Sequence, residues 1–87
     1  MSHQVKIESA ARRQMRNLPK AILPRIDAAI RQLATEPRPQ GCRQLTGHAD
    51  TYRIRVGDYR ILYRIVDEIL VVLVVRVGHR REIYRRD

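Results

Sequence analysis

The chain has 87 residues, of which 44% are hydrophobic, and 18 Lys or Arg against 9 Asp or Glu give it a formal net charge of +9. This length fits one domain over residues 1–87, and its core must be mainly aliphatic because Trp and Phe are absent. One cysteine excludes an intramolecular disulfide and a cysteine metal cluster, and the apolar run from Ile69 to Val75 is too short to cross a membrane.

Arginine carries almost all of the positive charge, since Lys6 and Lys20 are the only lysines. Its planar guanidinium binds phosphate through two parallel hydrogen bonds, so the charge indicates a nucleic acid, an anionic surface or an acidic protein as partner. A plainer interpretation is that the charge only keeps a small domain in solution. The lone Cys42 and a start without a signal-peptide core predict a soluble, cytoplasmic protein with no membrane partner.

The first residues predict a short strand and a helix. Val5 and Ile7 alternate with polar neighbours, as residues of a strand do. Ser9 is a suitable N-cap for the helix that follows. This helix ends before Pro19, because the residue preceding a proline disfavours the helical conformation.

A second helix is predicted from Ile22 to Leu33, where apolar residues recur at helical spacing. Pro24 then lies in the first turn, where its missing N–H costs little. The short connection between the two helices predicts an antiparallel helical hairpin. The proline and glycine content of residues 35–41 predicts a loop, and the chain is expected to stay irregular up to about Thr51.

Apolar and basic residues alternate on both sides of Gly57-Asp58, which predicts two half-buried strands joined by a tight turn. In this register Val56 faces Tyr59, Arg55 faces Arg60, and Arg53 faces Leu62. A second turn at Asp67-Glu68 leads into an almost continuously apolar strand from Ile69 to Val77, which Gly78 ends.

The predicted order is β-α-α-β-β-β, an α+β fold in which the helical hairpin packs on one face of a small, mostly antiparallel, twisted sheet. The side that meets the helices should carry Tyr52, Ile54, Val56, Ile61, Tyr63, Ile65, Val72 and Val74. The other side should carry Arg53, Arg55, Arg60 and Arg64 beside Leu62, Val71 and Leu73. An apolar floor walled by arginines suits a stacked base with flanking phosphates.

Arg55 and Arg60 are like charges placed directly opposite each other, and such pairs destabilise a hairpin. A chain that retains this pair is expected to present its arginines to an anion. The alternative is that Arg53, Arg55 and Arg64 form only the solvated side of an antiparallel sheet.

The helical hairpin and two later segments resemble the RelE/ParE superfamily of bacterial toxins from toxin–antitoxin modules. The segments are QLTGHADTYRIRVGDYRILYRI and VVLVVRVGHRREIY. The resemblance covers nearly the whole chain and depends on the combination of residues 45–63 with Val77-Gly78-His79-Arg80 and Tyr84. Members of the RelE branch are ribosome-dependent endoribonucleases that cut messenger RNA, whereas members of the ParE branch poison DNA gyrase.

The resemblance also implies site residues. Arg53 and Arg55 match positions where the RelE branch has basic residues, often lysines. Arg60 matches its phosphate-binding arginine, Arg80 its second arginine, and Tyr84 its C-terminal tyrosine. All five positions hold a suitable residue, which favours the ribonuclease branch.

Metal-independent cleavage by a ribose 2′-hydroxyl needs a proton acceptor, donors around the phosphoryl oxygens and a proton source for the leaving oxygen. Arg60 and Arg80 suit the role of donors to the phosphoryl oxygens, because arginine stays charged. Tyr84 is a candidate for base stacking or proton transfer. The identity of the general base stays open: His79 is the first candidate, His48 the second, and Tyr84 a further one. If none of them acts as the base, positioning and charge dominate and intrinsic cleavage is slow. RNA binding is assigned to Arg53, Arg55 and Arg64.

The expected partners are a RelB-like antitoxin, the ribosome and messenger RNA, with no metal and no small-molecule cofactor. An acidic antitoxin segment would cover the arginines or displace the C-terminal residues. Two rival functions stay open. One is a ParE-like gyrase inhibitor that works through its helices. The other is a non-catalytic nucleic-acid-binding module, whose binding would depend steeply on salt without strand scission.

Overall fold

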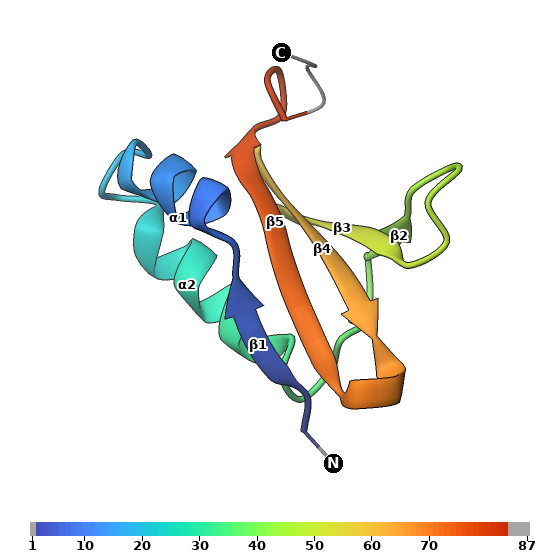
Figure 1. Ribbon diagram of the computed structural model, residues 1–87. Coiled ribbons are helices and arrows are strands. Elements are labelled where there is room, and N and C mark those ends of the chain that lie inside the picture. The colour runs from blue at the N-terminus through green and yellow to red at the C-terminus, as the bar shows by residue number, and fades with distance from the viewer. Residues whose placement is uncertain (1, 84–87) are drawn as a thin grey trace.

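The computed structural model describes residues 2–83, which form two helices beside one five-stranded sheet (Figure 1). The elements are β1 (Gln4–Ile7), α1 (Ser9–Arg16), α2 (Leu23–Gln32), β2 (Arg43–Gln44), β3 (Thr51–Val56), β4 (Tyr59–Val66), a 3-10 turn η1 (Asp67–Ile69) and β5 (Val71–His79). Across the sheet the strands lie in the order β1-β5-β4-β3-β2, and only β1 and β5 run parallel. The predicted α+β fold is confirmed, with β2 as an additional strand.

Both helices cover the same side of the sheet, where α1 packs against β5 and α2 against β3 (Figure 1). The core lies between these layers, and the residues predicted to face the helices belong to it, Tyr52 being half-buried. Pro24 lies in the first turn of α2, as predicted. Within residues 2–83 no helix combines the length and the apolar character needed to span a membrane.

The tight turn between β3 and β4 depends on Gly57. Its φ of 59° is the left-handed conformation that a type II′ turn requires at its first central residue. The turn sets the predicted register, in which Arg55 pairs with Arg60 and Arg53 with Leu62. The hairpin prediction is therefore confirmed pair by pair.

Several boundaries differ from the prediction. Ser9 is the first residue of α1 rather than its N-cap, and no side chain caps the helix. A two-residue strand, β2, pairs with Tyr52 and Arg53 in a segment predicted to be irregular. The last strand begins at Val71, because η1 and the left-handed Leu70 precede it. It also continues through Gly78, which pairs with a residue of β4 instead of ending the strand.

A bulge in β5 reverses the alternation of its side chains. Leu62 pairs with Arg76 but Tyr63 pairs with Val74, so Val75 is one residue more than β4 can match. Such an extra residue moves every later side chain to the opposite side of the sheet. Val77 is consequently buried on the helix side at 1% exposure, while Arg76 joins Leu62 on the side away from the helices.

A cluster of polar contacts, which we call the clasp, joins four segments that are far apart in the chain. Arg38, in the loop between α2 and β2, donates hydrogen bonds to the Asp67 carboxylate at 2.9 Å and to the Tyr52 hydroxyl at 3.2 Å. His3 Nε2 lies 3.1 Å from the other oxygen of Asp67. These contacts, with Arg38 as the stronger influence, hold the pKa of Asp67 below its ordinary value.

Candidate nucleic-acid interface

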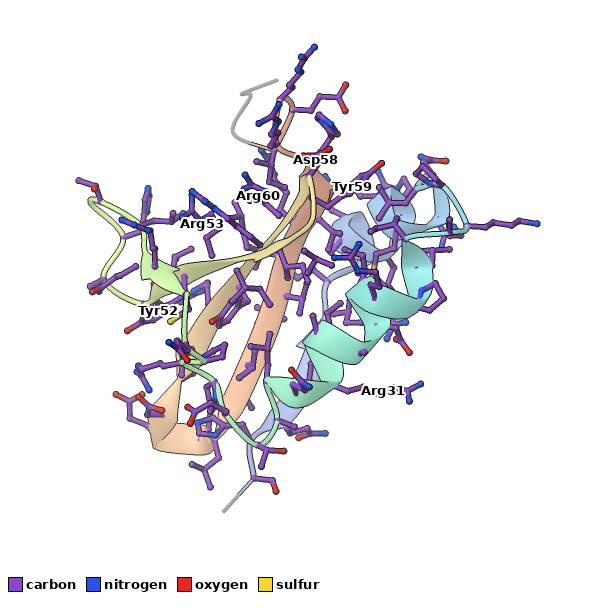
Figure 2. All side chains as sticks on the ribbon, turned by 180° about the vertical axis from the view of Figure 1, so that it is seen from behind. Arg31, Tyr52, Arg53, Asp58, Tyr59 and Arg60 are labelled. Carbon is purple, nitrogen blue, oxygen red and sulfur yellow. The ribbon has the colours of Figure 1, made fainter. Side chains whose placement is uncertain are left out.

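The side of the sheet away from the helices is strongly basic, and we call it the arginine face. The strand register places on it Arg43 of β2, Arg53 and Arg55 of β3, Arg60 and Arg64 of β4, and Arg76 of β5. Figure 2 shows Arg53 and Arg60 on this side, whereas Tyr59 points towards the helices. The face thus unites the arginines predicted for it and adds Arg43 and Arg76.

Arg60 is only 9% exposed and is held by the hairpin itself. Its Nη1 donates to the carbonyl oxygens of Gly57 at 3.2 Å and of Tyr59 at 3.0 Å. These carbonyl dipoles stabilise the guanidinium charge, so the fold accommodates Arg60 opposite the exposed Arg55 without an external anion. The opposition of like charges is therefore not by itself evidence for an anionic ligand.

The predicted apolar floor consists of Leu62, Val71 and Leu73, of which Val71 and Leu73 are half-buried and Leu62 is buried. It lies between Arg53 and Arg76 in the register and is only 8% exposed. Both of these neighbours are arginines, whose aliphatic stems can pack over an apolar side chain while the charged heads stay in water. Leu62 therefore offers little surface to an RNA base, and Val71 and Leu73 are the more accessible members of the predicted floor.

Arg64 differs from the other arginines because it is tied to an acid. Its Nε and Nη2 both donate to Asp50 Oδ2, at 3.0 Å and 2.7 Å. This contact holds the pKa of the Asp50 carboxyl below its ordinary value. The pair neutralises much of the local charge, so Arg64 is expected to attract a phosphate less strongly than Arg55.

A groove of about 680 Å³ borders the arginine face. It is bounded by α2, residues 39–42 and β3, and its basic residues are Arg43, Arg53 and Arg55. Within residues 2–83, β2 pairs with β3 only as far as Arg53, so the groove follows an open strand edge. A basic groove of this shape can follow the backbone of a single-stranded nucleic acid.

Arg80 follows the end of β5 and is fastened to the hairpin turn. Its backbone N–H donates to the Asp58 carbonyl at 2.8 Å, and its Nε lies 4.0 Å from the Asp58 carboxylate. Its side chain is 54% exposed and therefore accessible to a ligand. Because Arg60 follows Asp58 by two residues, the structure brings both predicted phosphate-binding arginines to the same end of the sheet.

His79 lies on the other side of the sheet from Arg60. It pairs with Tyr59, and the two rings meet edge to face with centroids 5.5 Å apart on the helix side. Its Nδ1 accepts the backbone N–H of Arg81 at 3.1 Å. A general-base role for His79 stays a prediction, and it requires the end of β5 to rearrange. The other candidates are His48, which is exposed in the loop between β2 and β3, and Tyr84, which lies outside the described residues.

Arg43 and Arg76 were missed at the sequence level for different reasons. A two-residue strand is too short to show a period, so nothing in the sequence pointed to Arg43. Arg76 carried a signal, because strict alternation from Val72 and Val74 would direct its charge into the core. Burying a charge there is costly, so a charged residue at a core position of a strand indicates a bulge.

Comparisons with known proteins find relatives over almost the whole chain. A family model described as "ParE toxin of type II toxin-antitoxin system, parDE" matches residues 5–84. Toxin RelG of Mycobacterium tuberculosis is 40% identical over 87 residues, which cover 99% of this chain and 100% of that protein. The mRNA interferase toxin RelE of Escherichia coli K12 is 27% identical over 88 residues, with coverage of 97% and 92%.

A solved structure shares the fold and most of the length. It is a chain of the toxin–antitoxin complex RelBE2 from Mycobacterium tuberculosis, which superposes with a TM-score of 0.81 at 34% identity. The match covers 91% of this chain and 99% of the other. The similarity therefore extends from the helices to the sheet that carries the arginine face.

Proposed function

The chain belongs to the ParE toxin family of type II toxin–antitoxin systems, and we propose that it acts as a ribosome-dependent endoribonuclease that cleaves messenger RNA. The relative from Escherichia coli K12 that is named an mRNA interferase supports this choice of activity. The ribosome as the site of action would place the protein in the cytoplasm.

The observation that carries the proposal is the meeting of Arg60 and Arg80 at one end of the arginine face. Arg60 lies on β4, and Arg80 lies beside the hairpin turn because its backbone N–H donates to the Asp58 carbonyl. Arg55, directly opposite Arg60, adds an exposed guanidinium to the same end. Two exposed positive charges, Arg55 and Arg80, beside the buried charge of Arg60 suit a phosphodiester whose negative charge grows during cleavage.

In the proposed reaction the ribose 2′-oxygen attacks the adjacent phosphorus while the bond from phosphorus to the 5′-oxygen breaks. The products are a 2′,3′-cyclic phosphate and a free 5′-hydroxyl. Arg60 and Arg80 would donate hydrogen bonds to the phosphoryl oxygens and hold the phosphate in line for the attack. Arg53 and Arg55 would bind the flanking RNA along the groove beside β3.

The proton that leaves the 2′-hydroxyl needs an acceptor, and the departing 5′-oxygen needs a proton. In the described part of the chain, the rows of the sheet around Arg60 present arginine, leucine and glycine, and none of these side chains takes up the proton of a hydroxyl group. His79, His48 and Tyr84 remain the predicted proton-transfer groups. The chain would therefore depend mainly on charge and positioning, and cleavage away from the ribosome should be slow.

A RelB-like antitoxin is the proposed regulator. A structural relative is a chain of a toxin–antitoxin complex, which supports a partner of that kind for this chain. Because this chain has a formal charge of +9, its arginine face would attract an acidic antitoxin segment. The bound segment would exclude RNA from that face. Neutralisation would then be competition for the same surface.

The test is to express Arg60→Ala and Arg80→Ala variants briefly and to map the 5′ ends of cellular transcripts. Both should lose the new cleavage sites and the growth arrest while still binding antitoxin. Because Arg60 is buried, Arg60→Met supplies a second variant that keeps an aliphatic stem but lacks the guanidinium. Arg31→Ala is the matched control, since Arg31 points outward from α2 (Figure 2) and forms an ion pair with Asp27 of the same helix at 2.8 Å. Wild-type cleavage by all three site variants would refute the assignment.

A second candidate function is suggested by the name of the matching family model, which is that of the ParE toxin. A gyrase inhibitor of that kind would use a protein-binding surface and would not cut RNA. Expression should then induce the DNA-damage response and leave transcript ends unchanged. The same experiment separates the two functions.

A further inference from the structure

The position of Arg76 on the arginine face results from the bulge at Val75. Val72 and Val74 are both fully buried at 0% exposure, so simple alternation would direct Arg76 into the core. The bulge instead aligns it with Leu62 of β4, in the row that also contains Arg53 of β3. The chain thus departs from a regular strand and brings this guanidinium to the same side as Arg60.

From there Arg76 reaches the residues that follow β5. Its Nη1 donates to the backbone carbonyl of Ile83 at 2.8 Å. The Ile83 side chain is 2% exposed, and its Cδ1 lies 3.4 Å from the position that a Cβ on Gly78 would occupy. The carbonyl is therefore held by a charged donor while the side chain packs over Gly78, which pairs with Arg60.

The segment from Arg80 to Ile83 is fastened at both ends. At its start the backbone N–H of Arg80 donates to the Asp58 carbonyl at 2.8 Å, and at its end Ile83 is held by Arg76. Between these points the N–H of Ile83 donates to the His79 carbonyl at 2.9 Å, which closes one helical turn. Arg80 is the first residue of this segment, so its backbone is held on both sides.

We propose that Arg76 is a positioning residue for the cleavage reaction, which holds the segment 80–83 across the end of the arginine face and so orients Arg80 towards the phosphate. This inference rests on the proposed function for its catalytic consequence, whereas the docking of the segment stands on the contacts alone. Arg76 acts through Ile83 rather than by touching the substrate.

The experiment compares Arg76→Ala, Arg76→Lys and the control Arg31→Ala in two measurements on the full chain. The first is hydrogen exchange at the amides of Glu82 and Ile83, both of which donate to the His79 carbonyl. In Arg76→Ala these amides should exchange about tenfold faster, the factor expected for loss of one hydrogen bond from a charged donor. Arg76→Lys keeps a cationic donor and should recover part of the protection, while Arg31→Ala should match the wild type.

The second measurement is ribosome-dependent cleavage of a messenger RNA under single-turnover conditions. Arg76→Ala should lower the rate at saturating ribosome about tenfold with little change in half-saturation, because orientation is lost rather than affinity. Faster exchange with an unchanged cleavage rate would overturn the positioning role, and so would slower cleavage with unchanged exchange. If the wild-type protein leaves messenger RNA intact, the proposed function and the catalytic role both fail, and exchange alone decides whether Arg76 docks the segment.

Discussion

Arg60 of β4 lies directly opposite Gly78 of β5, so the most buried arginine of the face has a neighbour without a side chain. The space above Gly78 is filled by Ile83, from the segment that also carries Arg80. Arg60 and the residues that follow β5 are therefore neighbours, because Ile83 packs over the glycine that pairs with Arg60. This relationship makes the end of the arginine face sensitive to side chains at position 78 that need the volume of Ile83.

A valine at position 78 should displace the segment that carries Arg80 from the sheet that carries Arg60. Its Cβ would lie 3.4 Å from Ile83 Cδ1, and its two methyl groups would need the volume that Ile83 occupies. Because valine favours strands, β5 should persist while the segment 80–83 is displaced. Cleavage by Gly78→Val should fall on the order of tenfold to a hundredfold. Gly78→Ala, whose Cβ makes only an ordinary contact, is the control, and equal activity of both variants would contradict the packing argument.

Arg55 should contribute a phosphate contact that can be read from the salt dependence of binding. Each phosphate neutralised on a single strand contributes a slope of about 0.7 to the plot of log affinity against log salt. The measurement uses the Arg60→Met variant, which is expected not to cleave the RNA. In this background Arg55→Gln should lower the slope of log affinity against log salt by about 0.7 for a short single-stranded RNA, measured by fluorescence anisotropy. Arg31→Gln removes the same charge from α2, where the side chain is 79% exposed. If both substitutions change the slope equally, the arginine face has no special part in binding.

Tyr63 should contribute to stability through its hydroxyl group as well as its ring. The residue is 0% exposed, and the hydroxyl donates to the Pro37 carbonyl at 2.7 Å. Burial raises the pKa of the Tyr63 phenol, which keeps it protonated as a donor. Tyr63→Phe leaves a buried carbonyl without this partner and should lower the free energy of unfolding in urea by about 1–3 kcal/mol. Tyr52→Phe, at a half-buried position, should cost less, and the reverse order would refute the argument.

The clasp should make the fold sensitive to acid. Arg38 first and His3 second lower the pKa of Asp67 from its ordinary 3.8, so the folded state binds the carboxylate's proton less readily than the unfolded chain. The stabilisation is complete above the unfolded pKa and is lost as the pH falls through the lower, folded value, in the range below about pH 4. Asp67→Asn should flatten the dependence of unfolding free energy on pH in that range.

The pKa of Asp50 is likewise lowered, by Arg64. The unfolding free energy of the Asp67→Asn variant should therefore still depend on pH in the same acidic range, but less steeply than that of the wild type. Asp27→Asn, in the exposed pair with Arg31 on α2, controls for the loss of one carboxylate. Stability curves of wild type and Asp67→Asn that run parallel down to pH 2 would show that the clasp does not couple to folding.

Local sequence patterns determined the hairpin and its register. Gly57-Asp58 sets the turn, and the alternation around it assigns Ile54 and Ile61 to the core and Arg55 and Arg60 to the opposite side. The two helices follow equally from spacing and from proline positions. These features were predictable because each depends on residues only a few positions apart, whose conformational preferences act before any tertiary contact forms.

The composition of the site, in contrast, was decided by tertiary structure. Whether Arg76 faces the core or the arginine face depends on one extra residue, and its position is chosen by the competition between burying Val77 and burying a charge. Tertiary packing also placed His79 away from Arg60 and covered Leu62. The sequence by itself determined that the two strands of the hairpin carry Arg53, Arg55, Arg60 and Arg64 on one side. Only the packed sheet decided which of those charges meet at one end, because that arrangement depends on pairing between residues far apart in the chain.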